Sequence, residues 1–206
     1  MNIKFTKDEL KNILISIIII SILFTVNMTR RTQWTQDNFI NILIITLIIF
    51  TISLTAKIYS QKSLARKFKY HIEYNIWGYG ILFSLVTMLL NVFIITPGYF
   101  KYGLYKRIAT DEEKAKIARI GPITNIILAI IFLLSLITIK SLTINIPILK
   151  LAMLIGFYIN TYMAAFNLIP FMTLDGIKIV EYDMKMWIVP MTASVILLII
   201  SFTSII

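Results

Sequence analysis

The chain has 206 residues, 58% of them hydrophobic, and a mean hydropathy of +0.85. This composition excludes an ordinary soluble globular domain and indicates an integral membrane protein. The net charge is +10, and the Lys and Arg residues lie in short segments between apolar runs. That distribution favours the headgroups of a lipid bilayer, rather than nucleic acid, as the partner of the basic residues. Cysteine is absent, which excludes disulfides and thiolate metal ligands.

Six apolar runs are long enough to reach across a hydrocarbon core of about 30 Å. They cover residues 10–28, 39–56, 72–96, 121–139, 148–169 and 187–206. No small-residue cleavage site follows the first run, so we interpret it as a helix rather than a signal peptide. The sequence therefore predicts an all-α polytopic membrane protein with five or six transmembrane segments and no separate soluble domain.

The third run, residues 72–96, decides the topology. If all six runs cross, the twenty Lys and Arg residues divide evenly between the two sides, ten and ten. If the third run enters and returns, sixteen of the twenty share the side of the N-terminus. Because membrane insertion selects such an asymmetry, we expect a re-entrant or hairpin-like third segment and a cytoplasmic N-terminus in a cell membrane. A plain sixth crossing is the alternative.

Polar residues gather at the ends of the second and fifth runs. Lys57 and Gln61 are four residues apart and therefore share one helix face. Lys57 has two interpretations, because a lysine near a helix end can extend to the headgroups or can belong to a buried site. The predicted threading brings Asn167 and Asp175, at the end of the fifth run, to the same membrane depth.

Two motifs accompany these residues: NLIPFMTLDG at 167–176 and GPITN at 121–125. They resemble the N-x-x-P-x-x-x-L-D-G and G-P-x-x-N signatures of the site-2 protease family, the zinc intramembrane metalloproteases, and particularly its archaeal-like members. The resemblance runs from about residue 56 to 187. It implies one membrane domain, 1–206, with a peripheral first helix and loop (1–37), a site-2 protease-like core (38–186) and a last helix (187–206).

The family's H-E-x-x-H motif, in which two histidines bind zinc and the glutamate is the general base, falls by this resemblance on Lys57, Ile58 and Gln61. Asp175 stands at the third-ligand position and Asn167 at that of an asparagine near the reaction centre. An ammonium has no lone pair and an amide oxygen is a poor zinc ligand. Ile58 cannot exchange protons. We therefore expect no catalytic residues, no metal and no other cofactor. Our hypothesis is that the Lys57 ammonium stands in place of the zinc, paired with Asp175 and assisted by Gln61.

The remaining expectations concern the surroundings. The only histidine, His71, lies in KFKYHIEY, which is typical of an interfacial segment with Tyr70 and Tyr74 at headgroup level. Pro170 is expected to end or unwind the fifth helix. A capping box of Thr110 and Glu113 predicts the start of a short polar helix that runs through Arg119. The pair Gly121 and Pro122 predicts the start of the fourth membrane helix.

Three functions remain open. The first is a catalytically inactive site-2 protease-like protein that binds or holds transmembrane segments of other proteins. The second is an active intramembrane metalloendopeptidase with an atypical zinc site. The third is a small transporter or channel component, which the lack of charged residues in the middles of the apolar runs disfavours.

Overall fold

The computed structural model describes residues 5–32, 36–89, 94–103, 109–143 and 145–203. These residues form seven helices and two short strands. In chain order they are α1 (Lys7–Thr32), α2 (Gln36–Lys67), β1 (Ile72–Ile76), α3 (Gly78–Leu89), β2 (Gly98–Tyr102), α4 (Asp111–Ser141), α5 (Pro147–Asn167), α6 (Asp175–Tyr182) and α7 (Met184–Phe202).

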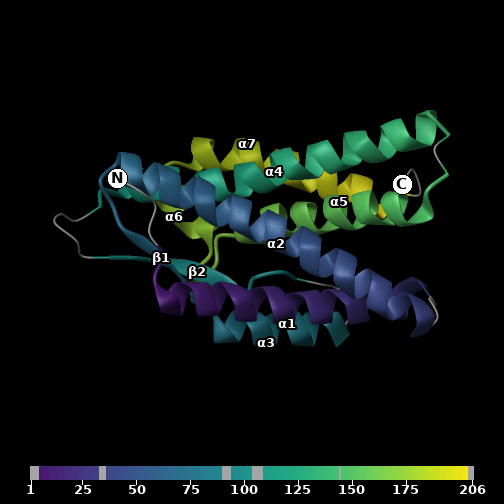
Figure 1. Cartoon of the computed structure of the whole chain (residues 1–206). Coiled ribbons are helices and arrows are strands. Elements are labelled where there is room, and N and C mark those ends of the chain that lie inside the picture. The colour runs from purple at the N-terminus through teal and green to yellow at the C-terminus, as the bar shows by residue number, and fades with distance from the viewer. Residues whose placement is uncertain (1–4, 33–35, 90–93, 104–108, 144, 204–206) are drawn as a thin grey trace.

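Five of the described helices, α1, α2, α4, α5 and α7, are long and apolar enough to cross a membrane. This confirms the predicted class, a multi-pass helical membrane protein. Figure 1 shows their arrangement: α2 runs diagonally between α1 and the α4–α5–α7 group. The last helix begins three residues before the predicted 187 and ends at Phe202, while residues 204–206 lie outside the described part of the chain.

The third apolar run does not form a long helix. Its strands β1 and β2 pair antiparallel, with Ile72 opposite Tyr102 and Ile76 opposite Gly98, so the chain returns to where it started. Between the strands, α3 has 12 residues and is therefore about 18 Å long, too short for a hydrocarbon core of about 30 Å. The segment has the geometry of a hairpin (Figure 1), although residues 90–93 lie outside the described chain.

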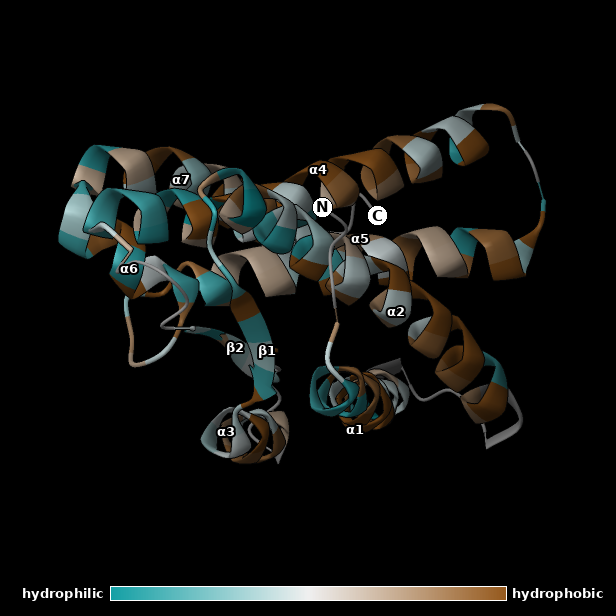
Figure 2. Ribbon diagram, turned by 60° about the vertical axis from the view of Figure 1, so that its left-hand side comes forward, coloured by the Kyte–Doolittle hydropathy of each residue, from teal (hydrophilic) through white to brown (hydrophobic). Residues whose placement is uncertain are grey.

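Polar residues concentrate at one end of the molecule. Figure 2 shows hydrophilic ribbon at α6, at the strands and at the start of α4, whereas the middles of α2 and α4 are hydrophobic. Figure 1 shows that the start of α1, the end of α2 and the start of α4 lie at this same end. The prediction that most Lys and Arg residues share one side of the membrane requires these segments to lie at one end of the molecule.

The fourth long helix corrects a prediction. The capping box of Thr110 and Glu113 is present, but α4 continues without a break through Gly121 and Pro122 to Ser141. A proline inside a helix removes the hydrogen bond to the carbonyl four residues earlier, here that of Ala118. That carbonyl accepts a hydrogen bond from a side chain of α2, as described below, so the helix tolerates the proline.

The second helix continues beyond its apolar run. The run ends near Ala56, whereas α2 extends to Lys67 and is 32 residues long. Lys57 is therefore ten residues before the end of the helix, and it is only 5% exposed. The interpretation in which Lys57 extends to the headgroups is wrong, because its side chain lies inside the protein.

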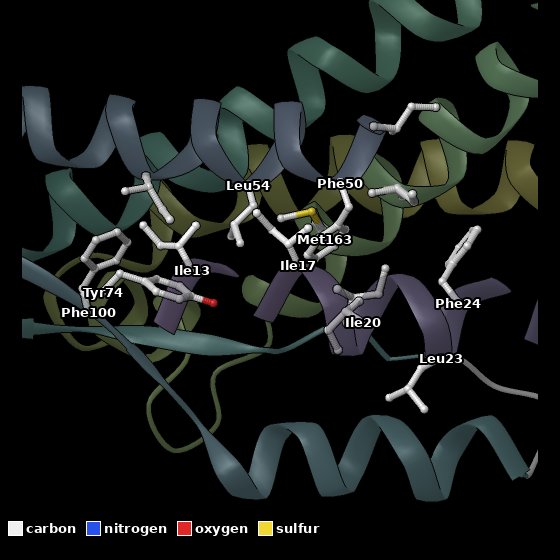
Figure 3. Packing of buried hydrophobic residues seen from close by; sticks show 14 of the residues in the cluster. Ile13, Ile17, Ile20, Leu23, Phe24, Phe50, Leu54, Tyr74, Phe100 and Met163 are labelled. Carbon is white, nitrogen blue, oxygen red and sulfur yellow. The ribbon is translucent and has the colours of Figure 1, made fainter. Parts of the chain in front are cut away.

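The first helix packs through one face against α2 and β1. Figure 3 shows Ile13, Ile17 and Ile20 of α1 in one cluster with Phe50 of α2. Tyr74 of β1 belongs to the same cluster, is 2% exposed and donates its hydroxyl to Ser16 of α1. Tyr74 is therefore enclosed by α1 and β1 within the protein, while its place at headgroup level stays a prediction.

Tyr70, which precedes β1, is 7% exposed and is likewise buried in this cluster. Both tyrosines are buried because the β1–β2 hairpin folds against α1 and leaves no open interface for them.

Candidate functional site

The end of α5 and the start of α6 bring two polar residues back toward α2. Helix α5 ends at Asn167, and Pro170, which follows its C-cap residue Leu168, cannot continue the helix. Helix α6 then begins at Asp175. A Cβ on Gly176 would lie 2.1 Å from the Leu168 carbonyl oxygen, so only glycine permits this close return. The expectation for Pro170 is confirmed.

Lys57 contacts both polar residues of this return. Its Nζ lies 3.0 Å from Oδ2 of Asp175 and donates a hydrogen bond of 2.7 Å to Oδ1 of Asn167. All three residues are buried. Asn167 in turn donates to the Met163 carbonyl within α5. The structure therefore brings together the pair proposed from the sequence, and Asn167 links α5 to α2.

Gln61 lies one turn further along α2 and contacts the same carboxylate. Its Nε2 donates to Oδ2 of Asp175 at 3.3 Å and to the carbonyls of Ile117 and Ala118 at 3.2 and 3.4 Å. Three acceptors around one nitrogen fix the orientation of the amide. The Ala118 carbonyl is the one that Pro122 leaves without an intrahelical donor.

The G-P motif also makes room for Gln61. A Cβ on Gly121 would lie 2.7 Å from Cδ of Gln61, so the absent side chain admits the amide against the helix backbone. The Oε1 atom of Gln61 is buried and has no hydrogen-bond partner among the described residues. Gly121 and Pro122 therefore act together: the glycine leaves space for the Gln61 side chain, and the proline leaves a backbone carbonyl of α4 free to accept its hydrogen bond.

The other predicted positions lie as follows. Ile58 is 1% exposed and belongs to the hydrophobic core cluster. His71 precedes β1 and its Nε2 lies 3.0 Å from Oε1 of Glu73, with about a third of its side chain exposed. It is thus engaged with Glu73 at the base of the hairpin.

A second polar cluster, which the sequence did not reveal, lies about two turns from Asn167. Asn160 of α5 donates to Ser53 of α2 at 2.9 Å, and Asn125 of α4 donates to Asn160 at 3.3 Å. All three are 0% exposed. Asn125 closes the G-P-x-x-N motif, and the spacing Ser53 to Lys57 puts both on one face of α2. These spacings were the available signal.

Lys178 was also missed. It follows Asp175 by three residues on α6, and its Nζ is buried with no hydrogen-bond partner among the described residues. Burial holds the pKa of Lys178 below its ordinary value, while the Asp175 carboxylate partly opposes this and Lys57 adds to it. The Nζ atom lies 5.2 Å from the centre of the Tyr102 ring of β2, within the range of a cation–π contact.

A further buried ion pair lies on the opposite side of α2. Lys62 contacts Glu9 of α1, and both side chains are almost fully buried. The other oxygen of Glu9 accepts the backbone N–H of Tyr74 at 3.0 Å. Lys62 also lies 4.3 Å from the centre of the Phe5 ring. No motif or spacing in the sequence indicates this role of Glu9.

Within the described residues, no three His, Cys, Asp or Glu side chains lie close enough together to hold a metal ion. The centre instead combines an ammonium, two amides and one carboxylate. Such a group can accept and donate hydrogen bonds at membrane depth, where polar atoms have few other partners.

Fold and site together define a multi-pass helical membrane protein with a buried polar centre on α2, α4, α5 and α6. The chain is 28% identical over 186 residues to the protein named "Putative zinc metalloprotease MJ0611" of Methanocaldococcus jannaschii, and the alignment covers 89% of each chain. No family model and no solved structure matches it.

Proposed function

We propose that the protein is a catalytically inactive, site-2 protease-like membrane protein that binds or holds transmembrane segments of other proteins. The contact of 3.0 Å between Lys57 and Asp175 carries this proposal. By the motif resemblance, Lys57 occupies the first zinc-ligand position and Asp175 the third. A side-chain cation thus stands beside the remaining carboxylate where the resemblance implies a metal ion.

The chemistry of the donor set supports the loss of zinc. A catalytic zinc site uses three protein ligands and leaves one position for water. Here Lys57 has no lone pair to offer, and Gln61 directs its amide nitrogen, a donor, toward Asp175. One carboxylate and one amide oxygen do not suit the ion. Ile58, at the position of the general base, is packed in the apolar core.

The setting of the site supports a membrane-spanning client and a cell-membrane location. The site lies at the end of the molecule that collects most of the Lys and Arg residues, which we propose to be cytoplasmic, as is the N-terminus. A neighbouring transmembrane segment can reach this end from the bilayer. The proposed partners are therefore the lipid bilayer and a transmembrane client peptide.

The metal assignment is tested by rebuilding the site. The purified protein is expected to contain far less than one zinc per chain, whereas Lys57→His/Gln61→His is expected to gain about one, because it restores a His₂Asp ligand set. The matched control is Lys57→His/Gln61→His/Asp175→Asn, which should lose that zinc. Elemental analysis after dialysis gives the readout.

The natural protein answers the main question even if the rebuilt variants fold poorly. Stoichiometric zinc in the unaltered chain, with chelator-sensitive hydrolysis of a membrane-spanning peptide, would establish instead the active metalloendopeptidase with an atypical metal site. The name of the archaeal relative favours that second function.

Client binding is tested with a synthetic single-span peptide in nanodiscs. The photoreactive residue p-benzoylphenylalanine replaces either Phe171, which is 49% exposed and close to Asp175 in sequence, or Ile48, which is 56% exposed on α2. We expect crosslinking at Phe171 well above that at Ile48. Equal yields at the two positions would indicate random collision in the bilayer and contradict the proposal.

A further inference from the structure

The charge around Asp175 is unbalanced. Two lysines act on this one carboxylate: Lys57, in direct contact, and Lys178, one turn along α6. Among the described residues, the charged groups that act on Lys178 are Asp175 and Lys57, so these three side chains together hold one positive charge in excess. Excess charge away from water is costly unless an opposite charge compensates it.

The hydrogen bonding of Lys178 is also incomplete. An ammonium carries three donors, yet the buried Nζ of Lys178 has no acceptor among the described residues. The face of the Tyr102 ring stabilises the charge but accepts no strong hydrogen bond. By contrast, Lys57 has both a carboxylate and an amide oxygen within 3.0 Å. Lys178 therefore lacks an anionic acceptor.

We propose that Lys178 binds a carboxylate of the captured transmembrane segment, namely an Asp or Glu side chain near the cytoplasmic end of that segment. This inference rests on the proposed function and names the class of client. One singly charged carboxylate balances the one excess positive charge. A lipid phosphodiester carries the same single negative charge, so the binding test below distinguishes it from a client carboxylate.

The first test measures the protein without a client. Lys178→Met removes a buried cation that has no hydrogen-bond acceptor among the described residues, so it is expected to raise the melting temperature in detergent by about 2 °C or more. Lys185→Met, at an exposed lysine of the neighbouring helix, is the matched control and should leave it unchanged. A lower melting temperature for Lys178→Met would mean that Lys178 has a structural partner, and would overturn the proposal.

The second test measures binding of two single-span peptides that differ only by Glu or Gln in the last turn. In nanodiscs of neutral phosphatidylcholine, the unaltered protein is expected to prefer the Glu peptide by about 10-fold or more, the value of a charge-assisted hydrogen bond. In Lys178→Met the preference should fall to about 1, while Lys178→Arg should keep most of it.

The outcomes distinguish a failure of client binding from a failure of the role of Lys178. If neither peptide binds the unaltered protein, the proposed function fails. If both bind equally well, the function survives and the role of Lys178 fails. The measurement is then repeated with phosphatidylglycerol in the nanodiscs. If this lipid abolishes the preference for Glu only when Lys178 is intact, a lipid phosphate occupies the site and the proposal for a client carboxylate is wrong.

Discussion

Helix α2 carries two buried lysine–carboxylate pairs that differ in what they join. Lys57 connects α2 to Asp175 at the start of α6, in the half of the molecule that also contains α4, α5 and α7. Lys62, five residues later, connects α2 to Glu9 on α1. The first pair belongs to the polar centre formed with Gln61 and Asn167, and the second lies outside it.

The two pairs differ in whether the charges and hydrogen bonds around them are matched. Glu9 is matched by Lys62 and accepts the N–H of Tyr74, which completes a contact among α1, α2 and β1. Asp175 faces two lysines and an amide, and one of these lysines, Lys178, has no hydrogen-bond acceptor within the described part of the chain. A buried ion pair whose charges and hydrogen bonds are all matched is sufficient for a purely structural role. The unbalanced cluster suggests that a ligand contributes to its stability.

Removal of the lysine from each pair is expected to have the largest effect on stability. Lys62→Met should lower the free energy of unfolding by about 3 to 5 kcal/mol, because it leaves Glu9 buried without a cation. Lys57→Met should cost less, about 2 to 3 kcal/mol, because Lys178 remains within electrostatic reach of Asp175. Denaturant unfolding in a single detergent provides both values.

Double-mutant cycles supply the control for these two values. Lys62→Met with Glu9→Gln, and Lys57→Met with Asp175→Asn, should each be less destabilising than the sum of the single changes. Strictly additive losses in the second cycle would mean that Lys57 and Asp175 do not interact in the folded protein.

Glycine substitutions test how the backbone positions the cluster around Asp175. Gly176→Ala should destabilise the protein by about 3 kcal/mol, since its Cβ would meet backbone 2.1 Å away. Gly121→Ala should cost about 1 to 2 kcal/mol, because the atom it meets belongs to the Gln61 side chain, which can shift.

Gly78→Ala is the matched control for both, because a Cβ there meets nothing within 4 Å. It should be neutral or slightly stabilising. If all three substitutions have the same effect, the close approaches at Gly121 and Gly176 do not determine the position of the site.

The smallest expected effect is a pH dependence confined to the unbalanced cluster. The pKa of Lys178 is lower in the folded protein than its ordinary value of 10.5. Between these two values the unfolded chain binds more protons, so stability rises with pH, whereas below both values the full penalty is present. The difference in melting temperature between Lys178→Met and the unaltered protein should therefore shrink as the pH approaches 10.5. A difference that is constant with pH would contradict this.

Much of the site could be predicted because its signals are local. The four-residue spacing of Lys57 and Gln61 fixes a shared helix face, and Pro170 fixes the end of α5. The predicted threading brings Asp175 to the same depth, and the motif resemblance places it at the third-ligand position. Glu9 could not be found in this way, because it is 53 residues from Lys62 and no periodicity connects the two.

The membrane class, the long apolar helices, the capping box at Thr110 and the faces on which polar residues lie follow from the sequence, because they depend on hydropathy and on helical spacing. The unbroken passage of α4 through Pro122 follows from the packing of helices, since the freed Ala118 carbonyl finds its donor on Gln61 of another helix. The burial of Tyr74, and the absence of an acceptor for Lys178 among the residues that the structure describes, likewise follow from that packing. Those outcomes depend on which distant side chains meet, and a buried polar atom is costly or stable according to that partner.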